Sequence, residues 1–154
     1  MFIIPQGVSS CICKVAFITV LLFNFGCTVK PDDLSANTSI DEIINLAEHA
    51  KSRKAFKEAG DFYMEVDRLF PYSDKSRKAL VGAMKSYHHG ADLINVRLSA
   101  KRYLTLYPDG PDAAFSQYMV GLSFFDAIVD VQRDQGAALH AVREFKKLDL
   151  DYVD

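Results

Sequence analysis

A repeat of 37 residues constrains this chain more than any other feature of its sequence. Two prolines that each follow an aromatic residue, Phe70-Pro71 and Tyr107-Pro108, lie 37 positions apart. From Ile40 onward the apolar residues recur at helical spacing, and the alternation of β-branched residues that predicts strands is absent. A fixed period of this size is typical of stacked helical hairpins, each of which buries one face on the next. The sequence therefore predicts an all-α chain from Ile40 onward.

The repeat keeps its register across three hairpins. In the first helix of each hairpin two columns repeat every 37 positions: Ala47, Met84 and Gly121, and Ala50, Tyr87 and Phe124. Three columns belong to the second helices, where the last spacing is 45: Ala59, Val96 and Ala141; Tyr63, Ala100 and Phe145; Val66, Tyr103 and Leu148. The small members let paired helices approach closely, and the large members fill the gap. This pattern of small and aromatic residues, closed by a proline, resembles the tetratricopeptide repeat.

The breaks in the apolar period predict the helices, at about 40–51, 54–69, 74–89, 92–106, 112–129 and 136–150. They form three repeats, at about 40–73, 74–110 and 111–154, and eight extra residues precede the last helix. Asp74 and Asp112 are expected to cap the helices that they begin, and each proline ends the helix before it. No further repeat follows the last helix in this sequence, so we expect marginal stability or self-association through its outer face.

The first 26 residues are expected to be a targeting signal rather than part of the fold. Lys14 precedes an apolar run over residues 15–25, and the small residue Gly26 follows it, as in a secretory signal peptide. The alternative is an uncleaved membrane anchor. A spanning helix needs roughly 20 apolar residues. This run is shorter, and extending it backward would bury the charge of Lys14.

Cys27 stands directly after Gly26, where a bacterial lipoprotein carries its acylated cysteine. Asn24 and Phe25 depart from the usual pattern, which has Leu and then a small residue there. Cleavage before Cys27 would leave a diacylglycerol on its thiol and a third acyl chain on its amine, and more than one chain gives stable anchoring. The alternative is a stray cysteine in an apolar leader. Residues 27–39 are polar, without an apolar period, and predict a flexible tether.

The order of these segments narrows the resemblance. A lipoprotein leader and a short tether precede repeats that end in Phe70-Pro71-Tyr72-Ser73 and Tyr107-Pro108-Asp109-Gly110-Pro111. The third unit contains the stretch Gln117-Tyr118-Met119-Val120-Gly121-Leu122 and an insertion with Arg133-Asp134. Over residues 40–152 the chain resembles the BamD (ComL) family, outer-membrane lipoproteins of the β-barrel assembly machinery. Family members usually carry further repeats. The resemblance therefore covers their amino-terminal half, and we expect a truncated product or a fragment.

Composition and motifs argue against catalysis and against nucleic-acid binding. The formal charge is −2, which does not suit a binder of phosphate backbones. The common signatures of hydrolases, metalloproteases and nucleotide-binding proteins do not occur. All three cysteines lie within the first 27 residues, and the adjacent His88 and His89 point about 100° apart on a helix. We expect no enzyme, no metal site, no small-molecule substrate and no cofactor apart from the covalent lipid on Cys27.

The candidate binding site is the side of the first helices that the core leaves free, on the concave face of the array. Its predicted positions are Lys78, Val81, Lys85, His88 and His89 in the second unit and Phe115, Tyr118, Leu122, Phe125 and Asp126 in the third. Cationic residues beside aromatic ones suit an extended peptide with an aromatic residue or a terminal carboxylate. Lys85 and Tyr118 are the main candidates for this peptide-binding groove, with Phe115 and Lys78 beside them.

Two basic runs have a simpler interpretation. They are Lys51, Arg53, Lys54 and Lys57, and Lys75, Arg77 and Lys78. Acidic residues follow or precede both runs closely, which favours a solvated face with local ion pairs. Contact with acidic lipid headgroups or with an acidic partner segment is the alternative.

The resemblance implies a non-enzymatic component of the β-barrel assembly machinery, lipid-anchored to the periplasmic face of the outer membrane of a Gram-negative bacterium. Its groove would bind segments of other assembly components and of unfolded barrel proteins. The alternative is a soluble periplasmic repeat protein that coordinates cell-envelope or cell-division factors, although that family usually has a coiled coil before its repeats. A lipid-anchored hydrolase is a third interpretation, which would be favoured if Tyr87, Phe124 or Phe145 were exposed and titratable groups converged there.

Overall fold

The helices follow one another in the predicted order. The computed structural model describes residues 29–35, 37–129 and 134–152. A short 3-10 helix, η1 (Pro31–Asp33), precedes the α-helices α2 (Ile40–Ser52), α3 (Phe56–Leu69), α4 (Asp74–His89), α5 (Leu93–Leu106), α6 (Ala113–Phe125) and α7 (Gln135–Tyr152). These described ranges contain no strand, which confirms the all-α class.

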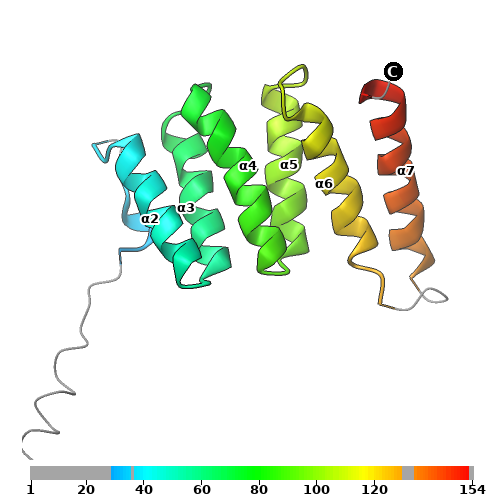
Figure 1. The fold of residues 1–154 in the computed structure, drawn as a ribbon, viewed down its shortest axis with the longest axis horizontal. Coiled ribbons are helices and arrows are strands. Elements are labelled where there is room, and N and C mark those ends of the chain that lie inside the picture. The colour runs from blue at the N-terminus through cyan, green and yellow to red at the C-terminus, as the bar shows by residue number, and fades with distance from the viewer. Residues whose placement is uncertain (1–28, 36, 130–133, 153–154) are drawn as a thin grey trace, which may run out of the picture. The chain divides into compact units, whose positions relative to one another are not determined.

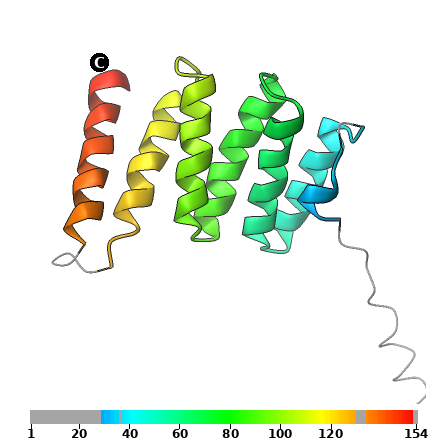
Figure 2. The same cartoon turned by 180° about the vertical axis from the view of Figure 1, so that it is seen from behind.

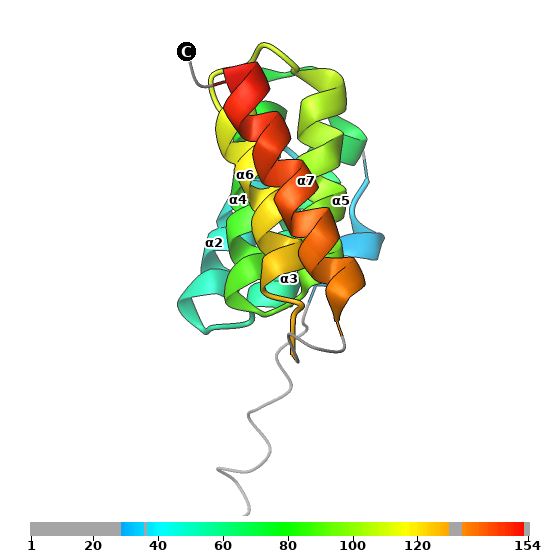
Figure 3. The same cartoon turned by 90° about the vertical axis from the view of Figure 1, so that its right-hand side faces the viewer.

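Consecutive helices pack as three hairpins that stack in chain order within residues 31–154 (Figure 1). α2 pairs with α3, α4 with α5 and α6 with α7, and the contacts of α3 with α4 and of α5 with α6 join the hairpins. The reverse view shows the same succession (Figure 2). Seen along the stack, α2, α4 and α6 lie toward one side and α5 toward the other (Figure 3). The architecture is a tetratricopeptide-like array.

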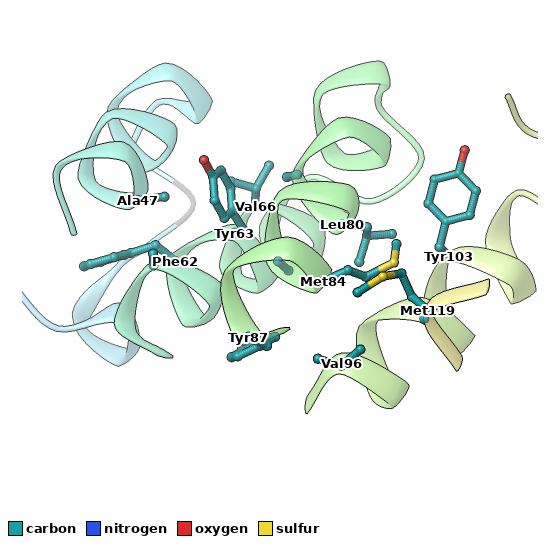
Figure 4. Close-up of a cluster of buried hydrophobic side chains, with 14 of the residues drawn as sticks. Ala47, Phe62, Tyr63, Val66, Leu80, Met84, Tyr87, Val96, Tyr103 and Met119 are labelled. Carbon is teal, nitrogen blue, oxygen red and sulfur yellow. The ribbon is translucent and has the colours of Figure 1, made fainter. Parts of the chain in front are cut away.

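The predicted register is the register of the core. Tyr63, Met84, Tyr87, Val96 and Tyr103 are all buried, and Figure 4 shows them among the packed helices. In the third hairpin the larger column members are less protected. Phe124, Phe145 and Leu148 are half-buried.

The aromatic residues at the ends of the second helices contribute to the core. Phe70, Tyr107 and Tyr152 all pack against the core cluster.

Two glycines allow aromatic rings to pack directly against the helix backbone. A Cβ on Gly82 would lie 3.0 Å from the ring of Tyr63, and one on Gly121 would lie 2.6 Å from the ring of Phe145. Close approach, rather than backbone freedom, explains these two glycines.

Two helix ends differ from the prediction for local reasons. α3 begins at Phe56 rather than near residue 54, because Lys54 adopts a left-handed backbone with φ of 61°. α6 ends at Phe125 rather than near residue 129. The N–H of Ile128 bonds back to the carbonyl of Phe125 and closes a turn there, so the insertion begins one helical turn earlier than expected.

The predicted aspartate caps are wrong. Ser73, not Asp74, is the N-cap of α4, and its hydroxyl accepts the N–H of Ser76 at 3.0 Å. Asp112 occupies the N-cap position of α6, but its side chain makes no capping hydrogen bond. Its carboxylate instead accepts a long hydrogen bond, 3.4 Å, from Nη1 of Arg77, so it links two hairpins.

The segment predicted as a flexible tether carries structure at residues 31–34. η1 contacts α3, and Leu34 is half-buried against the core cluster. The N–H of Leu34 donates to the carbonyl of Pro31 at 3.2 Å. One leucine in a polar segment produces no apolar period, so no pattern in the sequence predicts this docking. The predicted leader, residues 1–26, and Cys27 lie outside the described residues. No described helix is long and apolar enough to cross a membrane.

Candidate functional site

The four predicted groove residues lie on two neighbouring first helices. Lys78 and Lys85 are exposed on α4, and Phe115 and Tyr118 lie on α6, which contacts α4. We call this surface the α4–α6 face. It consists of Lys78, Val81, Lys85 and His88 from α4 and of Phe115, Tyr118, Leu122, Phe125 and Asp126 from α6 and its C-cap. The face joins a basic half to an aromatic half.

Lys85 and Phe115 connect the two halves. Nζ of Lys85 lies 5.3 Å from the centroid of the Phe115 ring. An ammonium group over an aromatic ring stabilises an exposed contact by about 0.5–1 kcal/mol. The structure therefore brings together two of the predicted residues and orients a cation over the aromatic half.

Tyr118 is held from another direction. Its ring centroid lies 6.0 Å from that of Phe145 on α7, and the side chain remains 41% exposed. Among the described residues, no hydrogen bond, ring contact or cation–π contact joins Tyr118 or Lys78 to Lys85. Tyr118 is thus the aromatic edge of the face nearest α7, and Lys78 is an exposed cation at its α4 side.

His88 and Asp126 form a pair that the sequence analysis did not predict, although it placed both residues on this face. Nε2 of His88 lies 2.8 Å from Oδ2 of Asp126. They are 38 residues apart in sequence, one more than the length of the repeat. This separation places them at nearly equivalent positions of neighbouring hairpins, and it was the one feature of the sequence that could have predicted the pair. The pair joins the ends of α4 and α6, so it fixes the spacing of the two helices at one end of the face.

Arg97 of α5 contacts the C-terminal part of α6. Its Nη1 donates to the carbonyl of Ser123 at 3.1 Å, and its guanidinium lies 4.4 Å from the centroid of the Phe124 ring. His140 stacks on the same ring, at 4.9 Å between centroids. Phe124 is therefore a half-buried contact of α5, α6 and α7. The sequence assigned this ring to the core without indicating its polar neighbours.

Most of the first basic run is paired with acidic side chains. Lys51 contacts Glu48 at 2.9 Å and Arg53 contacts Glu58 at 2.5 Å. Lys57 lies within 4 Å of both Asp61 and Asp92. The solvated face with local ion pairs is the better interpretation of this run, because these partners neutralise the charge that acidic lipids would require.

Tyr63 links the two helices of the first hairpin through a carboxylate. Its hydroxyl donates to Glu48. That hydrogen bond, together with Lys51, lowers the pKa of Glu48. Burial, with the same hydrogen bond, raises the pKa of Tyr63 above its ordinary value. A hollow of about 390 Å³ adjoins this pair and is lined by Glu48, Lys51, Ser52, Phe56 and His89.

The histidines do not gather into a ligand set in the part of the chain that the structure describes. The ring centroids of His88 and His89 lie 6.5 Å apart. No group of three histidine, cysteine or acidic side chains in those ranges could hold a metal ion. Tyr87 is buried, and Phe124 and Phe145 are half-buried, so none of these three rings shows the exposure that would favour a hydrolase site.

Comparison with known proteins bears on the whole array. The model of the YfiO family, described as outer membrane lipoprotein, matches residues 37–154. The chain is also similar to the outer membrane protein assembly factor BamD of Caulobacter vibrioides, with 32% identity over 118 residues. This alignment covers 75% of the present chain and 36% of the relative, so the chain spans about a third of that protein's length.

Proposed function

Since the chain belongs to the YfiO family of outer membrane lipoproteins, we propose that it is a lipid-anchored, non-enzymatic component of outer-membrane β-barrel assembly. The assembly role named for the Caulobacter relative and the helical array support this proposal. The protein would act at the periplasmic face of the outer membrane of a Gram-negative bacterium. Its task would be to position segments of partner proteins and of unfolded barrel proteins for insertion.

The α4–α6 face is the observation that carries the binding role. Phe115, Tyr118 and Phe125 offer rings at helical spacing, and Tyr118 and Phe125 are large exposed side chains. Lys78 and Lys85 supply positive charge along one edge. A segment with an aromatic side chain and a carboxylate could place its ring against α6 and its charge against α4.

The anchoring role depends on Cys27. Acylation there would confine the array to a thin layer beside the membrane, which raises the effective concentration of the groove for membrane-bound partners without any new contact. The short chain from Cys27 to η1 supports this proposal, because little spacer separates the two.

Peptide titration of the full chain tests the binding role. The probe is an extended peptide that ends in an aromatic residue with a free carboxylate, carrying a fluorophore at its other end. We expect Phe115→Ala and Lys85→Ala each to weaken binding by roughly five- to tenfold, which corresponds to about 1–1.4 kcal/mol. The matched control is Ile94→Ala, because Ile94 is exposed on α5 and lies outside the face. Equal affinity in all four proteins would exclude the groove.

Labelling with palmitate in a Gram-negative host tests the anchoring role. We expect label on the wild-type chain and none on Cys27→Ser. The same cells separate the proposed function from a soluble periplasmic protein, because acylated chain sediments with the outer membrane and a soluble chain does not. Label that survives Cys27→Ser would contradict acylation at this residue.

A further inference from the structure

Residues 31–34 form a docked segment between the predicted lipid site and the array. η1 contacts α3, and Leu34 packs against the core cluster beside it. The pKa of Arg68 in α3 is raised mainly by its hydrogen bonds to Glu65 and in small part by the charge of Asp32, which agrees with η1 lying beside the end of α3. The array therefore holds the chain from Pro31 onward, nine residues before α2 begins.

The docking shortens the free spacer. Four chain steps separate Cys27 from Pro31, and an extended chain covers about 14 Å in that length. If residues 31–39 were undocked, the spacer would run to Ile40 and would reach about 45 Å. Contacts of one short helix and one leucine thus reduce the maximal reach about threefold.

We propose that the segment Pro31–Leu34 is a strap that holds the α2–α3 end of the array against the phospholipid surface. The inference rests on the proposed acylation of Cys27. With the strap docked, the lipid on Cys27 and the first hairpin are separated by no more than the short spacer. The strap thereby limits how far the α4–α6 face can lie from the membrane, since that face belongs to the same stack of helices.

Charge does not account for such a contact. Asp32 and Asp33 are exposed on η1, and Asp41 and Glu42 are exposed at the start of α2. Anionic headgroups would repel these carboxylates. The first hairpin is therefore held near the lipid surface by the covalent anchor and the strap, and the contact should be weaker on anionic than on neutral vesicles.

Energy transfer from the array to a vesicle tests the strap. The acylated full-length product is reconstituted into neutral phosphatidylcholine vesicles with a headgroup-labelled acceptor of short transfer range. The donor sits on the cysteine of Glu42→Cys, the sole free thiol once the leader is removed and Cys27 is acylated. The release variant is Leu34→Asp, and its matched control is Ser35→Asp, which places the same charge on the adjacent exposed residue.

We expect transfer to fall by about half or more in Leu34→Asp and to stay unchanged in Ser35→Asp, because only the first variant lengthens the spacer. An insertion of eight Gly and Ser residues between Lys30 and Pro31 should give the same loss while leaving the docked contacts intact. This second variant decides the matter if Leu34→Asp fails to fold. Equal transfer in all proteins, high or absent, would overturn the strap. Palmitate incorporation then shows whether the proposed anchoring has failed as well.

Discussion

The ring of Tyr87 fills the space that a side chain at Gly60 would need. A Cβ on Gly60 would lie 2.5 Å from Cε1 of Tyr87. Tyr87 is only 3% exposed, and its hydroxyl donates to Asp61 at 2.8 Å. Burial, together with this hydrogen bond, raises the pKa of the phenol above its ordinary value. One tyrosine of the second hairpin is thus seated on α3 of the first, and this contact fixes how the two hairpins stack.

Replacing Gly60 should destabilise the array. In an exposed helix, alanine is favoured over glycine by about 1 kcal/mol. Overpacking against a buried ring costs about 1–3 kcal/mol. We expect Gly60→Ala to lower the free energy of unfolding by up to about 2 kcal/mol in urea titrations, because the overpacking outweighs the gain in helix propensity. Gly136→Ala is the control, because a Cβ there meets nothing within 4 Å. Equal effects of the two substitutions would show that the ring does not need the space.

Glu48 should make the stability of the fold depend on pH in the acidic range. The hydrogen bond from Tyr63 lowers the pKa of Glu48 below its ordinary value of 4.5. The folded chain therefore holds this proton less tightly than the unfolded chain. The stabilisation is complete above pH 4.5 and is lost as the pH falls through the folded value. Between pH 6 and pH 3 the melting temperature should fall less steeply with decreasing pH in Glu48→Gln than in the wild-type chain. Glu42→Gln, on the exposed side of α2, should leave the slope unchanged.

Arg102 should matter more than its exposed position indicates. Asp67 is 3% exposed and accepts hydrogen bonds from Oγ of Ser76 and from Nε of Arg102, each at 2.8 Å. Without the guanidinium, this buried carboxylate loses its charged partner. We expect Arg102→Ala to cost about 1.5–3 kcal/mol of unfolding free energy. Arg53→Ala breaks an exposed pair with Glu58 and should cost about 0–1 kcal/mol. A ranking in the opposite order would contradict the buried pairing.

The outer face of α7 should cause self-association of this chain. Leu139, Val142 and Leu150 are exposed there, the last at 81%, and they surround a hollow of about 350 Å³. Exposed apolar patches of this kind are typical of surfaces that bind another protein or a second copy of the chain. We expect sedimentation at micromolar concentration to show species above the monomer, and Leu139→Gln combined with Leu150→Gln to restore the monomer. Ile94→Gln, which replaces an exposed apolar residue on α5 rather than on α7, should have no effect. A monomeric wild type would contradict this expectation.

The stack was predictable because helical periodicity and repeat length reinforce each other. Met84 and Val96 were assigned to the core from their columns, and both are fully buried. A helix presents one face to its neighbour, and repetition at a constant interval places equivalent residues on that face. The same reasoning placed Lys85 and Phe115 on one surface, and the structure brings them into contact.

Contacts made by single side chains could not be predicted from the repeat pattern. Ser73 and Asp74 are adjacent, and either type of side chain can cap a helix, so sequence alone could not decide between them. Leu34 docks as an isolated apolar residue, which leaves no period to detect. Where the insertion interrupts the repeat, the end of α6 depends on one turn at Phe125, and the pattern placed that end one turn late.

Photo-crosslinking from the α4–α6 face to an unfolded barrel protein tests the central claim most directly. A photoreactive phenylalanine analogue replaces Tyr118 in one protein and Leu98 in another, because both residues are large and exposed but Leu98 lies on α5, outside the face. Each is mixed with a purified barrel protein diluted from urea and is then irradiated. We predict crosslinks from position 118 that the aromatic-ended peptide displaces, and none above background from position 98. Equal crosslinking from both positions, or crosslinks that the peptide leaves unchanged, would contradict the proposed binding groove.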